Sequence, residues 1–81
     1  MKPRILLVED EEKLRRVVEL QLRQAGFEVD QAGSAEEGLK LADRAGLVLT
    51  DLRLPGMDGL EFLRRVKQIN PQVAVVMMTA F

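Results

Sequence analysis

The sequence contains neither cysteine nor histidine. Without cysteine the chain has no disulfide framework and no thiolate metal site. Without histidine it lacks the commonest general base and the commonest zinc ligand. Any metal site in this chain is therefore expected to be built from oxygen atoms.

An excess of charge of one sign is also missing, because 12 basic residues nearly balance 13 acidic ones. This balance gives no reason to expect that the segment binds nucleic acid or an anionic membrane surface. The first residues, "MKPRILLVEDEE", include too few apolar positions for a signal peptide, and no apolar run approaches the length of a membrane span. We therefore expect a single cytoplasmic domain.

Four strand-like segments are separated by helical patterns. The segments that begin at Ile5, Leu47 and Val73 are continuously apolar, which is typical of strands buried on both faces. The segment 27–32, "FEVDQA", alternates apolar and polar residues, which favours an edge strand. The stretches between these segments predict three helices.

The ends of the predicted helices are marked by residues that favour such positions. Gly26 suits the position that follows the first helix. Ser34, with Glu37 three residues later, forms a capping box for the second helix. Asp58 suits the start of the third helix, and Pro71 suits its end.

Strands that alternate with helices predict a parallel sheet with right-handed crossovers. The alternating second strand belongs at an edge, outside the first strand. The predicted fold class is therefore α/β, a flavodoxin-like doubly wound parallel sheet with strand order 2-1-3-4 and helices on both faces.

Acidic residues follow the two strands that are neighbours in this order. Glu9 and Asp10 end the first strand, and Asp51 ends the third. The chain leaves these strands toward opposite faces, so a crevice is expected at their carboxyl ends. Three carboxylates in one crevice repel each other unless a cation lies between them. A few carboxylates with water suit Mg2+ best.

A carboxylate beside Mg2+ can also act as a nucleophile toward a phosphoryl group, and Asp51 is the candidate. Thr79 ends the fourth strand, next to the third, where its hydroxyl would reach a bound phosphoryl group. Pro55, Gly56 and Gly59 predict a tight turn beside this site.

Simpler interpretations exist for each of these residues taken alone. Asp10 would serve as the N-cap of the first helix, Thr79 as an ordinary strand-end hydroxyl and Arg53 as an exposed loop residue. Other acids suit the exposed first turns of helices, where they favour the positive end of the helix dipole: Glu11, Glu12, Glu36 and Glu37. The coincidence of acids at both strand ends favours the crevice.

The segments "ILLVEDEEKLR", "VLTDLRLPGMDGLEFL" and "VMMTAF" resemble the receiver domain of two-component response regulators over the whole chain. The resemblance implies that Asp51 is the phosphoacceptor and Thr79 the switch hydroxyl. It also implies that Mg2+ is held by Glu9, Asp10, Asp51 and the backbone carbonyl of Arg53. In sequence, these segments are most similar to the receiver domains of DNA-binding transcription activators.

The resemblance further implies a sensor histidine kinase as the phosphoryl donor and a signalling module rather than an enzyme. Against that family, residues 1–81 would form a partial receiver domain that lacks the last helix, strand and helix, with a lysine on the missing strand. We therefore expect impaired phosphotransfer. The uncharged segment 73–78 becomes an edge strand, which predicts a homodimer or higher oligomer through that edge.

Two other functions stay open. In one, the chain does not take part in phosphotransfer and acts as a self-associating structural module. In the other, it is a magnesium-dependent hydrolase with Asp51 as nucleophile. Such enzymes usually place a second acid two residues later, where this sequence has Arg53.

Overall fold

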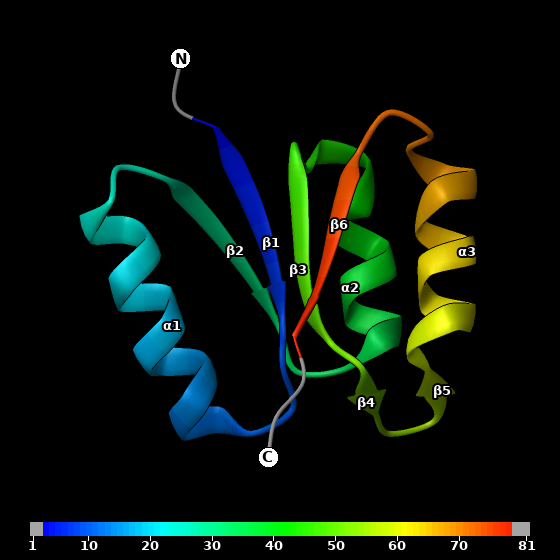
Figure 1. Cartoon of the computed structure of the whole chain (residues 1–81), viewed down its shortest axis with the longest axis horizontal. Coiled ribbons are helices and arrows are strands. Elements are labelled where there is room, and N and C mark those ends of the chain that lie inside the picture. The colour runs from blue at the N-terminus through cyan, green and yellow to red at the C-terminus, as the bar shows by residue number, and fades with distance from the viewer. Residues whose placement is uncertain (1–2, 79–81) are drawn as a thin grey trace.

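A computed structural model of the chain describes residues 3–78. They form a four-stranded parallel sheet with order β2-β1-β3-β6 (Figure 1). The strands are β1 (Arg4–Val8), β2 (Glu28–Ala32), β3 (Leu47–Asp51) and β6 (Ala74–Met78). The helices are α1 (Glu12–Gln24), α2 (Ala35–Leu41), the short 3-10 helix η1 (Ala42–Arg44) and α3 (Gly59–Ile69). The predicted fold class and strand order are confirmed, with β6 as the fourth strand.

The main core lies between the sheet and the pair of helices α2 and α3. Leu6 and Val8 of β1 point to this side, where they pack with Phe62 and Val66 of α3, and all four are fully buried. Gly38 lets α2 approach closely, because a Cβ there would lie 3.0 Å from Val8 and 3.1 Å from Phe62. Burial of these side chains is the main stabilising term for the sheet.

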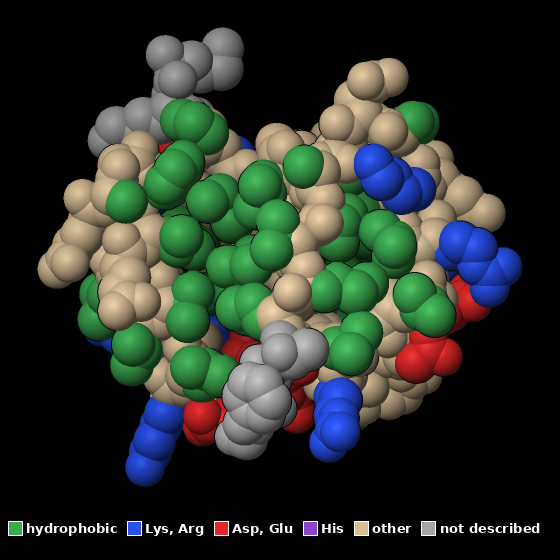
Figure 2. Space-filling model, in the orientation of Figure 1, with side chains coloured by type: hydrophobic (Ala, Val, Ile, Leu, Met, Phe, Trp, Pro, Cys, Tyr) green, Lys and Arg blue, Asp and Glu red, His purple; other side chains and the backbone are tan. Residues whose placement is uncertain are grey.

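Helices lie on both faces of the sheet, as expected, but among the described residues the face opposite α2 and α3 is covered only in part. The single helix α1 lies along β2 and β1 (Figure 1). Leu14, Val17 and Leu20 of α1 stay exposed, and Val76 of β6 is 45% exposed. Figure 2 shows the hydrophobic side chains gathered in the middle of this face, between α1 and α3.

The helix boundaries follow the capping residues, with one correction. Ser34 and Asp58 accept hydrogen bonds from first-turn N–H groups of α2 and α3, and Gly26 follows α1 with φ of +99°. The N-cap of α1, however, is Glu11, whose carboxylate accepts from two backbone N–H groups. The cap alternative for Asp10 is therefore wrong, and Glu11 is not a plain first-turn acid.

The predicted tight turn after Asp51 is a small hairpin. Strands β4 (Arg53–Leu54) and β5 (Met57–Asp58) pair antiparallel on either side of Pro55 and Gly56. Gly56 has φ of +79°, a conformation that favours glycine. The hairpin leads the chain from the end of β3 into α3.

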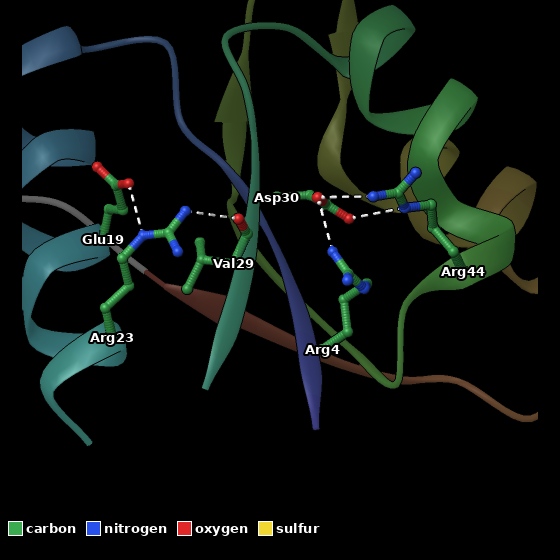
Figure 3. Close-up of polar contacts among 6 residues, drawn as sticks. All are labelled: Arg4, Glu19, Arg23, Val29, Asp30 and Arg44. Atoms are coloured by element: carbon green, nitrogen blue, oxygen red, sulfur yellow. Dashed lines mark hydrogen bonds and ion pairs between the residues drawn. The ribbon is translucent and has the colours of Figure 1, made fainter. Parts of the chain in front are cut away.

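An ion-pair network ties β2 to its neighbours (Figure 3). The carboxylate of Asp30 accepts hydrogen bonds from Arg4 of β1 at 3.0 Å and from Arg44 of η1 at 3.0 and 3.1 Å. Both oxygens of Asp30 are therefore paired with cations.

A second arginine contact joins α1 to β2 (Figure 3). Arg23 donates to the carboxylate of Glu19 at 2.8 Å and to the carbonyl oxygen of Val29 at 3.0 Å. Glu19 is a buried residue of α1 whose Oε2 pairs with Arg23, whereas its Oε1 accepts no hydrogen bond within the described residues. Within residues 3–78, no helix is long and apolar enough to cross a membrane.

Candidate functional site

The candidate site lies at the carboxyl ends of β1 and β3, which are neighbours in the sheet. Glu9 and Asp10 follow β1, and Asp51 is the last residue of β3. From β1 the chain enters α1 on one face, whereas from β3 it runs through the hairpin to α3 on the other (Figure 1). This is the point of a doubly wound sheet where ligand sites form.

The structure brings the three acids together. One carboxylate oxygen from each of Glu9, Asp10 and Asp51 lies within 4.8 Å of the other two. Glu9 and Asp51 are buried, with exposed fractions of 2% and 7%, whereas Asp10 is exposed. The cluster therefore has two acids at its base and one at its mouth.

Backbone groups fix the orientation of the two buried acids. The N–H of Glu11 donates to Oε2 of Glu9 at 2.9 Å, and the N–H of Arg53 donates to Oδ1 of Asp51 at 3.0 Å. The second oxygen of Glu9, Oε1, is fully buried and receives no hydrogen bond within the described chain. A buried oxygen without a donor is costly, so its presence points to a missing positive group.

The three acids also destabilise each other's charged forms. Burial raises the pKa of Glu9 to about 7, and the carboxyl groups of Asp10 and Asp51 add to the rise, against the Glu11 N–H, which lowers it. Among residues 3–78, no lysine or arginine forms an ion pair with any of the three. An oxygen-only cluster with an unpaired buried oxygen fits a hard cation such as Mg2+.

The remaining predicted site residues are placed less directly. The side chain of Arg53 is exposed, and its carbonyl oxygen stays a predicted ligand. Thr79 lies outside the residues that the structure describes. Pro55 and Gly59 flank the hairpin beside Asp51, where a Cβ on Gly59 would lie 2.9 Å from the carbonyl oxygen of Leu52.

Two contacts at the site were not predicted. Glu11 holds Glu9 through its backbone N–H, and Arg15 donates from Nη1 to the carbonyl oxygen of Glu9 at 2.8 Å. The sequence signal for the Arg15 contact was its position one helical turn after Glu11, near the start of α1.

Comparison with known proteins gives one consistent result. Residues 5–81 match the family of response regulator receiver domains. The chain is 46% identical to the uncharacterized transcriptional regulatory protein YkoG of Bacillus subtilis, over 98% of this chain and 36% of YkoG. It is 35% identical to sporulation initiation phosphotransferase F of the same species, over 100% of this chain and 67% of that protein.

A solved structure shows the same fold. The chain superimposes on the response regulator protein TrrA of Thermotoga maritima, crystallised in complex with Mg2+-BeF, with a TM-score of 0.89 and 34% identity. The match covers 100% of this chain and 71% of TrrA. The chain thus spans about a third of YkoG and about two thirds of these two shorter relatives.

Proposed function

This chain belongs to the family of response regulator receiver domains, and we propose that it accepts a phosphoryl group on Asp51. Receiver domains interact with sensor histidine kinases, so the proposed donor is a phosphohistidine of such a kinase. A carboxylate oxygen of Asp51 attacks phosphorus and forms an acyl phosphate bond. The phosphorus–nitrogen bond breaks, and the imidazole leaves with its electron pair and takes up a proton.

The observation that supports this function best is the unpaired, fully buried Oε1 of Glu9 beside two further carboxylates. Asp30 has arginines on both oxygens, and buried Glu19, whose Oε1 also accepts no hydrogen bond, pairs with Arg23 through its other oxygen. Glu9 differs from both, because no lysine or arginine within residues 3–78 pairs with it. The orientation of Asp51 by the Arg53 N–H adds support, because it fixes one carboxylate oxygen and leaves the other for the reaction.

In this proposal Glu9, Asp10, Asp51 and the carbonyl oxygen of Arg53 hold Mg2+. When bound, Mg2+ neutralises charge on the phosphoryl oxygens. Thr79 joins the proposal through its place in the sequence directly after β6, as the hydroxyl that contacts the phosphoryl group. The chemistry is limited to the chain's own aspartate, so no turnover of phosphate esters is expected.

The direct test is incubation with acetyl phosphate and Mg2+ followed by intact mass measurement. We expect an adduct of about 80 Da, one phosphoryl group, on the wild-type chain. The adduct should be absent in Asp51→Asn and retained in Asp30→Asn, which removes an aspartate outside the cluster. No adduct on the wild type, or an unchanged adduct on Asp51→Asn, would contradict the proposal.

The domain assignment also belongs to the proposal, in which residues 1–81 form a partial receiver domain; the chain spans 36% of YkoG. The expected impairment of phosphotransfer and the cytoplasmic location stay predictions. The same acetyl phosphate experiment tests the first of these, because a severely impaired site would give only a trace of adduct.

We also propose that copies of the chain associate through β6, which lies at an edge of the described sheet. The N–H of Leu52 bonds the carbonyl oxygen of Met78, so alternate residues Val75 and Met77 direct their N–H and C=O groups away from β3. Two β6 strands related by a two-fold axis at Val76 would pair these groups, Val75 of each copy with Met77 of the other. The strand carries no charge to oppose this pairing.

Light scattering over a concentration series tests this association. We expect a dimer or larger species for the wild type and a monomer for Val76→Lys, which places a charge on the edge strand. A wild-type monomer at high concentration would exclude the self-associating structural role proposed for β6 without affecting the phosphoacceptor proposal.

A further inference from the structure

The loop between β1 and α1 decides where two of the three clustered acids lie. It consists of Glu9, Asp10 and Glu11. Glu9 is anchored on one side by its N–H, which donates to the carbonyl oxygen of Ala32 at 3.0 Å. Its carboxylate is held by the Glu11 N–H. These contacts leave the peptide group between Glu9 and Asp10 to be fixed by something else.

That peptide group is held by Arg15. The guanidinium of Arg15 is half-buried and donates from Nη1 to the carbonyl oxygen of Glu9 at 2.8 Å. It forms no ion pair with a carboxylate within the described residues, so it does not compete with a cation for Oε1 of Glu9. A charge-assisted bond of this length restrains the backbone more strongly than a neutral one.

Gly33 provides the space that Arg15 occupies. A Cβ at Gly33 would lie 3.0 Å from Nη1 of Arg15, closer than side chains normally approach. The φ of Gly33 is not positive, so its backbone conformation does not require glycine. The contact is spatial: a Cβ here would push the end of the Arg15 side chain aside, so the loop after β2 is joined to the loop after β1 through Arg15.

We propose that Arg15, seated against Gly33, is a positioning residue that fixes the Glu9–Asp10 peptide group so that both carboxylates can bind one cation with Asp51. The proposal rests on the Mg2+ site of the proposed function. It assigns Arg15 no contact with the metal or the phosphoryl group. Residues that orient metal ligands in this way typically change metal affinity by about 10- to 100-fold when they are replaced.

The test compares three variants by Mg2+ titration calorimetry. Arg15→Gln should weaken Mg2+ binding about 10-fold. Arg16→Gln removes the same charge from the next residue, whose side chain is 70% exposed, and should change the affinity less than about 2-fold. Gly33→Ala displaces the guanidinium without changing any charge and should act in the same direction as Arg15→Gln.

A double variant makes the test specific. If Gly33 acts through Arg15, adding Gly33→Ala to Arg15→Gln should weaken Mg2+ binding no further. Equal affinities for Arg15→Gln and Arg16→Gln would overturn the proposal. The proposal would also be overturned if Gly33→Ala weakened Mg2+ binding as much in the Arg15→Gln background as it does alone.

Amide hydrogen exchange without metal separates this proposal from the proposed function. Exchange at Asp10 and Glu11 should be faster in Arg15→Gln than in Arg16→Gln. If the wild type binds no Mg2+ but this difference is present, the positioning contact stands and the proposed function fails. If the exchange rates are the same in both variants, Arg15 does not position the loop.

Discussion

Two carboxylates attached to the same sheet differ in their surroundings. Asp30 of β2 lies between Arg4 and Arg44, and each of its oxygens accepts a hydrogen bond from a guanidinium. Glu9, at the end of β1, has two acids beside it and one oxygen without a donor in the described chain. The pKa of Glu9 rises to about 7, because burial and the neighbouring carboxyl groups disfavour its charge.

In the proposed function, this difference separates an acid that stabilises the fold from an acid that binds a cation. The fold neutralises Asp30 with its own side chains, so Asp30 is complete without any further partner. Glu9 has no such partner within the described residues, and in the proposed function a bound cation neutralises its charge. Replacing each acid in turn should therefore have opposite effects on the free energy of unfolding.

The largest expected effect is on the pH dependence set by Glu9. Its pKa in the folded state, about 7, lies above the ordinary value of 4.5, so the folded state holds a proton that the unfolded state has lost. The resulting stabilisation is complete below pH 4.5 and is lost as the pH rises through about 7. Without metal, the free energy of unfolding should fall by about 1–3 kcal/mol over this window.

Urea denaturation at a series of pH values, followed by circular dichroism, measures this loss. Glu9→Gln should flatten the profile above pH 4.5, and Mg2+ should reduce the loss in the wild type. A wild-type profile that rises between pH 4.5 and 7 would show that Glu9 is not strained in the metal-free protein.

A smaller effect is expected for Asp30→Asn, and it is a loss of stability rather than the relief of a pH-dependent loss expected for Glu9→Gln. The substitution removes the charge that pairs with Arg4 and Arg44 and should lower the free energy of unfolding by about 1–2 kcal/mol. The value stays small because the side chains of Arg4 and Arg44 are 35% and 53% exposed. Glu28→Gln, on the same strand, is the matched control and should change stability by less than about 0.5 kcal/mol. Equal losses in the free energy of unfolding for Asp30→Asn and Glu28→Gln would contradict the structural role of Asp30.

The smallest effect is expected for Glu61→Gln on α3. Glu61 also bonds two arginines, and Arg65 and Arg64 lower its pKa, but this pair of contacts is exposed. The contribution of Glu61 to the free energy of unfolding is present above pH 4.5 and is lost as the pH falls through the lowered pKa. Thermal unfolding should show that Glu61→Gln lowers the free energy of unfolding by less than Asp30→Asn does. High salt should remove most of this loss. A loss as large as that of Asp30→Asn would contradict the role assigned to burial.

The fold was largely predictable because its signals are local and periodic. Three continuous apolar strands and one alternating strand fixed the sheet order, and Ser34 and Asp58 marked two helix starts. The hairpin of β4 and β5 was missed because two-residue strands are too short to show any periodicity. The choice of Glu11 over Asp10 as a cap depends on where the chain turns, which adjacent acids do not reveal.

At the site, topology alone was enough to bring Glu9, Asp10 and Asp51 to one end of the sheet. The unpaired oxygen of Glu9 was not predictable, because it depends on the rotamer that the Glu11 N–H selects. The Arg15 contact was also not predictable, since it joins segments on two different strand ends and requires the space left by Gly33.

The central claim is that the three acids form one cation site, and titration calorimetry with Mg2+ tests it most directly. We expect one ion per chain with millimolar affinity, lost in Asp51→Asn and unchanged in Asp30→Asn. At a free concentration equal to the dissociation constant, the ion should add about 0.4 kcal/mol to the free energy of unfolding. Undiminished binding by Asp51→Asn, or no binding by the wild type, would contradict the account.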